Sequence, residues 1–161
     1  MDDLYNRQLL ELAGSIAHIG LLDGAMGTAT RHSRLCGSTV TVSVDVDAQG
    51  RVCRFGQDVK ACALGQASSS ILGRHVIGRS LTEIETARDG LRALLKEGVL
   101  PQDPNFPELD ILAPVRDYKA RHASTMLAFE AAAEAVAQAL GGKEALGGED
   151  VAPALDGAGR V

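Results

Sequence analysis

Residues 39–46 read Thr-Val-Thr-Val-Ser-Val-Asp-Val, and this stretch decides the fold class. Its valines alternate with polar residues, so an extended chain has one apolar face and one polar face. Strict alternation with β-branched residues is typical of a half-buried strand. The next residues, Asp47-Ala48-Gln49-Gly50, are typical of a turn, because Gly50 can adopt a positive φ. A second strand is expected over 51–59, which makes the stretch one arm of an antiparallel hairpin.

Helical patterns flank this hairpin on both sides. The clearest is the capping box Ser80-Leu81-Thr82-Glu83, in which Ser80 caps the helix and Glu83 reaches back to it. Helices and an antiparallel sheet in this order predict an α+β fold with a small sheet packed against several helices. The expected helices cover 3–14, 62–78, 80–97 and 116–140, and the connecting loops include 20–30, which enters a strand, and 98–107.

The length of the chain fits one domain, which we expect over residues 1–140. Residues 141–161 are rich in glycine and lack the apolar periodicity of a helix. This segment is therefore expected to be a flexible tail that the fold does not need.

Composition excludes several classes of function. The chain has 161 residues and a formal net charge of −5, with two tyrosines, three phenylalanines and no tryptophan. Few aromatic side chains can stack on bases and the negative charge repels phosphate, so both argue against nucleic-acid binding. No apolar run approaches the ~18 residues of a membrane span, and the start Met1-Asp2-Asp3 lacks the features of a signal peptide. We expect a cytoplasmic protein that does not associate with membranes.

The cysteines are the candidate reactive groups. Cys36 precedes the alternating strand, and Cys62 lies where the second strand gives way to a helix. Unpaired N–H groups and the dipole at a helix N-terminus favour the thiolate, the form that binds metal and carries sulfur. A hairpin of this length can bring both thiols to one edge of the sheet, although metal binding, sulfur chemistry and burial all remain open. Cys53, on the second strand in register with Phe55, is expected to be buried.

Three stretches resemble the NifU/IscU-like (U-type) scaffold proteins of iron–sulfur cluster assembly. Residues 35–38, Leu-Cys-Gly-Ser, resemble the family's Cys-Gly-Asp segment. Residues 62–70, Cys-Ala-Leu-Gly-Gln-Ala-Ser-Ser-Ser, followed by Gly-Arg-Ser-Leu at 78–81, resemble its second-cysteine segment. Residues 121–128, Arg-His-Ala-Ser-Thr-Met-Leu-Ala, resemble its third-cysteine segment at the start of the last long helix. The likeness covers about residues 1–140.

The resemblance implies a three-stranded antiparallel sheet and a non-enzymatic protein that assembles a [2Fe–2S] cluster. Family members receive sulfur from a cysteine desulfurase-type donor and pass clusters to apo iron–sulfur acceptor proteins. Three cysteines, an Asp and often a His form their site, and zinc can occupy the same ligands. In this chain Cys36 and Cys62 match two of the cysteines, whereas Ser38, Ala123 and Ser124 stand at the Asp, His and third-cysteine positions.

A [2Fe–2S] cluster takes four ligands, usually thiolates, so the matched pair is incomplete. Two subunits could share a cluster through Cys36 and Cys62 of each, as a metal-linked homodimer. Alternatively His122 could supply a third ligand, or an external thiol or a partner protein could complete the site. His122 and Ser124 face opposite sides of a continuous helix, so the His122 option requires a late helix start. His32, four residues before Cys36, is either close to the site or exposed.

Two main functions follow. The first is a scaffold or carrier that binds iron or a [2Fe–2S] cluster through Cys36 and Cys62. The alternative is a relative that binds zinc or accepts persulfide sulfur without assembling a cluster. A Cys-nucleophile enzyme lacks an orienting third group and an oxyanion motif here, and a pure interaction module is the remaining class. The charged segment 116–121 is either a docking face for a sulfur donor or chaperone, or a solvated helix start.

Overall fold

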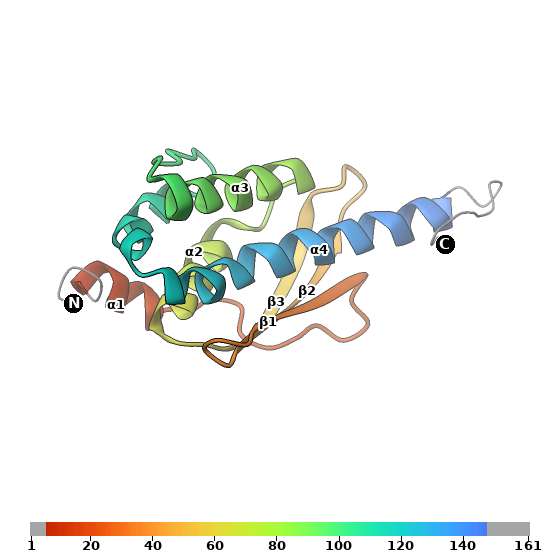
Figure 1. The fold of residues 1–161 in the computed structure, drawn as a ribbon. Helices are drawn as coiled ribbons and strands as arrows, with labels where there is room; N and C mark the ends of the chain where they lie inside the picture. Colours follow the sequence, from red (N-terminus) through yellow and green to blue (C-terminus); the bar gives the residue numbers. More distant parts are fainter. Residues whose placement is uncertain (1–5, 148–161) are drawn as a thin grey trace.

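Three antiparallel strands, in the order β1-β2-β3, form the sheet of this protein (Figure 1). The structure is a computed structural model and describes residues 6–147. The strands are β1 (Gly27–Ser33), β2 (Ser38–Val46) and β3 (Val52–Lys60). The predicted α+β class with a small three-stranded sheet is confirmed.

The central strand β2 follows the valine alternation. Val40, Val42 and Val44 have no exposed surface, because they face the helices that cover the sheet. In the following turn the Asp47 carboxylate accepts from the Gln49 and Arg51 N–H groups (2.9 and 3.0 Å). Gly50 adopts a φ of +79°, so the predicted turn and hairpin are both confirmed.

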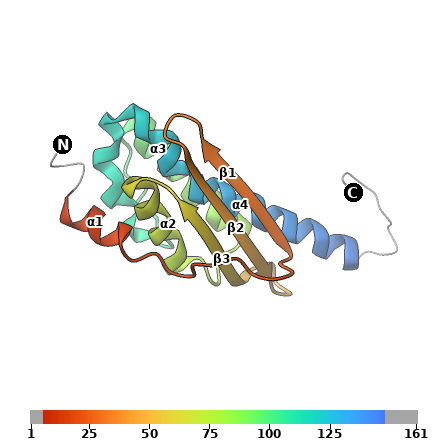
Figure 2. The ribbon, with the colours of Figure 1, turned by 90° about the horizontal axis from the view of Figure 1, so that it is seen from below.

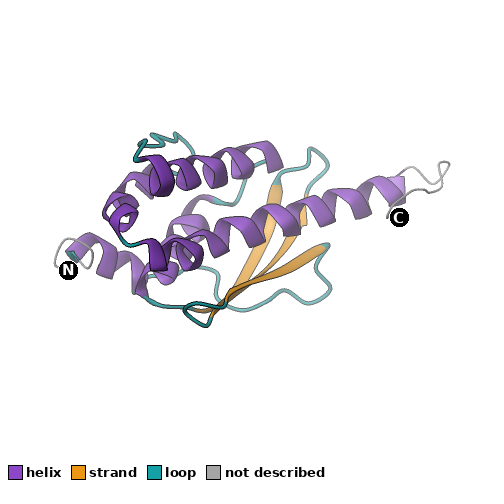
Figure 3. Ribbon diagram, in the orientation of Figure 1, coloured by secondary structure: helices purple, strands orange, loops and turns teal. Residues whose placement is uncertain are grey.

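The helices gather around this sheet, and α4 crosses one of its faces (Figures 1 and 3). Seen from below, the strands lie in front of α4 (Figure 2). In chain order the helices are α1 (Arg7–Ala13), α2 (Ala63–His75), α3 (Leu81–Glu97), the 3₁₀ helices η1 (Pro107–Asp117) and η2 (Lys119–Arg121), and α4 (His122–Gly147). No helix in residues 6–147 is long and apolar enough to cross a membrane.

Small residues let α4 approach the sheet closely. Ala131, Ala132 and Ala135 are fully buried, and a Cβ built on Gly27 of β1 would lie 2.0 Å from the Ala135 carbonyl oxygen. Only glycine fits at that position, because the Cβ of any other residue would clash with the α4 backbone. The contact holds the middle of α4 against the start of β1, at the opposite end of this strand from the Ser33–Ser38 pair.

The last helix differs from the prediction at both ends. Its expected start at residue 116 was wrong: η1 contains Pro114, and Tyr118 adopts a non-helical conformation (φ −118°, ψ 76°), so α4 begins at His122. The flexible tail was expected from 141, whereas α4 continues to Gly147. Extending an existing helix is easier than starting one, and the residues after the glycine pair are good helix formers. Residues 148–161 lie outside the described part.

The expected burial of Cys53 was also wrong. Cys53 is exposed, whereas Val52 and Phe55 are buried. The register between β2 and β3 shifts at Asp45 and Val46, so an extra residue on β3 breaks the alternation. The bulge turns Cys53 outward, and its Sγ contacts the Asp45 carbonyl oxygen at 3.5 Å.

Candidate metal and sulfur site

Cys36 lies in the tight loop between β1 and β2. Ser33 and Ser38 are the last paired residues of these strands, and the Gly37 N–H donates to the Ser33 carbonyl (2.8 Å). Gly37 closes the loop with a φ of +68°, a conformation that glycine adopts without strain. The sequence Cys-Gly-Ser therefore sets Cys36 at the end of the sheet.

Cys62 is the N-cap of α2, just past the end of β3. Thr39 pairs with Lys60 across the two strands, which brings Ser38 next to the chain as it leaves the sheet. The Cys62 N–H donates to Ser38 Oγ (3.4 Å), and Ser38 is buried. Both cysteines thus lie at the same end of the hairpin, as the sequence predicts for strand ends.

The end of η2 and the start of α4 contact the two thiols. Cys36 Sγ lies 3.5 Å from the Ala120 carbonyl oxygen and accepts from the Arg121 guanidinium at 3.7 Å. Cys62 Sγ lies 3.5 Å from Ser124 Oγ. The segment 120–124 therefore joins the two thiols into one site, although it is far from both in the sequence.

The surroundings of Cys62 favour its thiolate. Burial by itself would raise the pKa of this thiol. The Ser124 hydroxyl, the Gly65 and Leu64 N–H groups at the start of α2 and the charge of Arg121 outweigh burial and hold the pKa below its ordinary value. This is the electrostatic effect of a helix N-terminus, with a hydroxyl and a guanidinium added to it.

The donor set of one chain is two thiols with two hydroxyls beside them. Ser38 and Ser124 occupy the positions where the resemblance expects an Asp and a third cysteine, and both are buried next to Cys62. In the described residues, no group of three His, Cys, Asp or Glu side chains could hold a metal ion. A thiolate pair fits a soft metal or sulfur, but it supplies only half of the ligands of a [2Fe–2S] cluster.

The ring of His122, the expected third ligand, contacts backbone carbonyl oxygens of η1. Its Nε2 lies 3.1 Å from the Val115 carbonyl oxygen and 2.9 Å from that of Arg116, so this nitrogen carries a proton and donates. Ligation by His122 stays a prediction, and Nδ1 is the nitrogen that could ligate while Nε2 keeps both carbonyl contacts. His32 is exposed, and the structure gives it no contact with either thiol.

Sequence reasoning placed Arg121 in the charged segment 116–121 and did not assign it to the thiol site. Its guanidinium contacts Cys36, and its carbonyl oxygen accepts from Ser124 Oγ (3.2 Å) and Thr125 Oγ1 (2.7 Å). The one available signal was its place three residues before Ser124, roughly one helical turn away. The site thus carries a fixed positive charge beside its thiols.

Comparison with known proteins identifies the family. The model of the NifU-like N-terminal domain matches residues 4–144. The chain belongs to this family. The predicted NifU/IscU-like membership is therefore confirmed, and the two thiols lie in a NifU-like domain.

Solved structures with the same fold support this assignment. A NifU-like protein (N-terminal) from Brucella abortus is 48% identical, covers 86% of this chain and 96% of its own, and has a TM-score of 0.83. A protein assigned as an iron–sulfur cluster assembly scaffold for the SUF system of Fervidobacterium islandicum is 16% identical over 84% of this chain and 98% of its own, with a TM-score of 0.75. A hypothetical protein is 24% identical over 85% and 99%, with a TM-score of 0.74. The last two show the shared fold.

No significant match was found among curated proteins. The NifU-like family and these neighbours associate the chain with scaffold proteins of iron–sulfur cluster assembly.

Proposed function

We propose that this NifU-like protein is a scaffold or carrier for iron–sulfur cluster assembly, and that it holds iron or a [2Fe–2S] cluster through Cys36 and Cys62. The observation that carries the proposal is the meeting of both thiols on the segment 120–124. The lowered pKa of Cys62 supports it, because the thiolate is the form that ligates iron. In this role the cluster is cargo, and the protein is not an enzyme.

The donor count leads to a proposal about stoichiometry. One chain offers two thiolates, and a cluster held by thiolates takes four. Two copies that each contribute Cys36 and Cys62 complete the set, so cluster loading links two chains. The expected partners are a cysteine desulfurase-type sulfur donor and apo iron–sulfur acceptor proteins.

The second candidate is zinc binding or sulfur acceptance without a cluster. It is favoured by the Ser38 and Ser124 hydroxyls at ligand positions. The Arg121 charge beside Cys36 favours the sulfur-accepting form, because a cation stabilises the thiolate that attacks sulfur. In sulfur acceptance, a thiolate of this chain attacks the outer sulfur of a donor persulfide. The donor S–S bond breaks, the donor cysteine leaves as a thiolate, and a new S–S bond forms here, with no net oxidation.

Anaerobic reconstitution with iron and sulfide separates these candidates. Iron, zinc, labile sulfide, visible absorption and molecular mass are measured for the parent, Cys36→Ala and Cys62→Ala. Cys53→Ala is the matched control, because it removes an exposed thiol near the opposite end of β3.

A scaffold binds iron and sulfide in equal amounts in a dimer, loses both in Cys36→Ala and Cys62→Ala, and keeps both in Cys53→Ala. A colourless parent that binds zinc through the same two cysteines supports the second candidate. If metal and sulfur uptake is unchanged in Cys36→Ala and in Cys62→Ala, both proposals are contradicted.

A further inference from the structure

A wide groove lies on the other side of the segment that carries the thiol contacts. Its volume is about 1070 Å³, and it is bounded by α3, the 3₁₀ segments, the start of α4 and the end of β1. The residues that line it and can carry positive charge are His32, Arg92, Lys96, Arg116, Lys119 and His122. Two carboxylates, Asp117 and Glu130, face them. The groove is thus locally cationic on a chain whose formal net charge is −5.

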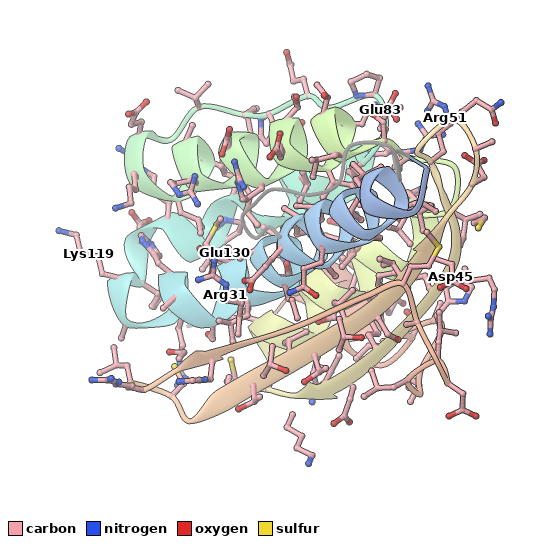
Figure 4. All side chains as sticks on the ribbon, turned by 90° about the vertical axis from the view of Figure 1, so that its right-hand side faces the viewer. Arg31, Asp45, Arg51, Glu83, Lys119 and Glu130 are labelled. Carbon is pink, nitrogen blue, oxygen red and sulfur yellow. The ribbon has the colours of Figure 1, made fainter. Side chains whose placement is uncertain are left out.

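Three of these cations are free to meet a ligand. Arg92 is already paired with Asp89 (2.9 Å) and Glu130 (3.6 Å). By contrast, Lys96, Arg116 and Lys119 form no ion pair with a carboxylate of the described residues. Figure 4 shows Lys119 extending outward, while Glu130 lies between α4 and α3.

The floor of the groove is apolar, and an apolar pair flanks its rim. Leu95, Met126 and Leu127 line the floor and are themselves almost fully buried. A Cβ built on Gly98 would meet the Arg116 guanidinium at 2.8 Å, so Arg116 lies over the end of α3. The next two residues, Val99 and Leu100, are 55% and 48% exposed. An exposed apolar pair therefore follows the end of α3 on which Arg116 lies.

We propose that this groove is the docking site for an acidic segment of a partner protein that also carries apolar side chains. The cations come from separate elements, and Lys96, Arg116 and Lys119 are exposed rather than buried around one point. A compact anion needs convergent donors, whereas carboxylates spaced along a peptide match cations spaced along a groove. The exposed Val99–Leu100 pair beside Arg116 provides apolar surface that side chains between the carboxylates can cover.

The groove and the thiol site share a wall. Ala120 and Arg121 contact Cys36, while their neighbours Lys119, His122 and Ala123 line the groove. A segment bound in the groove therefore lies against the residues that position the thiols. Docking in the groove does not depend on metal or sulfur binding at Cys36 and Cys62, because the experiment measures peptide binding to the metal-free protein.

The test uses a peptide of alternating glutamates and leucines with a single tryptophan. The protein has no tryptophan, so the fluorescence of the peptide reports binding directly. The same peptide with glutamine at each glutamate position is the charge control. We expect the glutamate peptide to bind the full chain, the glutamine peptide to bind more weakly, and added salt to weaken the first.

Charge reversal locates the site. Lys96→Glu with Lys119→Glu is expected to weaken peptide binding by roughly tenfold, because each change removes an attraction and adds a repulsion. Arg7→Glu makes the same kind of charge change on α1, away from the groove, and is expected to leave binding within about twofold. Cys36→Ala and Cys62→Ala should bind the peptide like the parent.

Three results would overturn the proposal. The first is no binding of the glutamate peptide, and the second is equal loss in the groove variants and in Arg7→Glu. The third is binding of inorganic pyrophosphate or citrate with the same dependence on Lys96 and Lys119 when the peptide does not bind, which assigns the groove to a compact anion. Circular dichroism of each variant confirms that the helices are intact.

Discussion

Cys62 shows how one residue type becomes reactive through its neighbours. The cysteine caps a helix, faces a serine hydroxyl and lies near an arginine, and together these outweigh its partial burial. Because the pKa of its thiol is lowered, the thiolate is present at a pH where an ordinary thiol is still protonated. A soft electrophile therefore reacts with Cys62 at lower pH than with a cysteine in an unfolded peptide.

The variant Ser124→Ala tests whether the serine hydroxyl lowers the pKa of Cys62. The variant loses the hydroxyl next to Cys62, so the pKa of the thiol should rise and the alkylation profile should move to higher pH. The measurement is the rate of iodoacetamide labelling at Cys62 against pH, followed by peptide mass spectrometry. An unchanged profile in Ser124→Ala would show that the hydroxyl plays no part.

Arg121 places a positive charge where a metal cation has to bind. Its guanidinium contacts Cys36, so an incoming zinc ion must displace it and lose the attraction between thiolate and arginine. Arg121 also lowers the pKa of Cys62, but it is the smallest of the causes that do so. We therefore expect the lost repulsion to dominate and Arg121→Ala to tighten zinc binding by up to roughly tenfold, the scale of one charge interaction near a protein surface. Competition with a chromophoric chelator measures this.

Arg121→Lys is the matched variant for that experiment, since it keeps the charge and is expected to stay close to the parent. Both variants keep the carbonyl that accepts from Thr125, so the start of α4 is retained. Weaker zinc binding in Arg121→Ala would mean that the arginine helps to hold the site together.

At the scale of elements, α3 depends on its capping box. The Ser80 hydroxyl accepts from the Glu83 N–H (3.2 Å), and the Glu83 carboxylate accepts from the Ser80 N–H (3.0 Å). The pKa of Glu83 lies below its ordinary value of 4.5, chiefly because of the hydrogen bond from the Ser80 N–H and then because of the charges of Arg79 and Arg51. Burial has a smaller effect in the opposite direction. A lowered pKa in the folded state means that the ionised carboxylate stabilises the fold above about pH 4.5 and loses this effect as the pH falls through the folded-state pKa.

We therefore expect Glu83→Gln, which keeps an acceptor for the Ser80 N–H but loses the charge, to lower the free energy of unfolding by about 0.5 kcal/mol at neutral pH. The difference from the parent should shrink in acid. Urea unfolding at neutral and acidic pH measures both, and Glu85→Gln, on the same helix but outside the cap, is the control. A difference that persists unchanged in acid would contradict the assignment to the carboxylate.

Two glycine substitutions test where α4 packs and where it ends. Gly27→Ala would push a Cβ into the α4 backbone and should destabilise the fold by about 2 kcal/mol or more. Gly141→Ala meets nothing within 4 Å and should stabilise a continuing helix by about 0.5–1 kcal/mol. Thermal unfolding measures both, and no effect at Gly141 would favour the tail predicted from the sequence.

These elements also show what the sequence could predict. The 39–46 hairpin and the capping box rest on neighbours in the chain, so local patterns were sufficient. The start of α4 depends on the non-helical conformation of Tyr118, and the outward turn of Cys53 depends on a β-bulge. Alternation and helical periodicity carry no signal for either feature. The contact of Cys36 with Arg121 joins residues 85 positions apart, and only packing could reveal it.

At the scale of the whole molecule, the fold brings together strand ends, a helix N-terminus and the start of α4, but this chain supplies two thiolates there. Ser38 and Ser124 lie next to Cys62, at the two positions where the resemblance expects further ligands. The proposed dimer therefore follows from the missing donors rather than from a dimer surface. Restoring the donors should remove the need for a second chain.

The variant Ser38→Asp with Ser124→Cys makes that test. It offers two original thiolates, a new thiolate and a carboxylate, which is a complete tetrahedral set for zinc in one chain. We expect the parent to bind one zinc ion per two chains and to dimerise with it, and the variant to bind one zinc ion per chain as a monomer. Light scattering with metal analysis measures both, and Ser43→Cys, at a buried serine in the middle of β2 away from the thiol site, controls for an added thiol. A variant that still dimerises on zinc would show that an intrinsic interface, rather than the ligand count, sets the assembly.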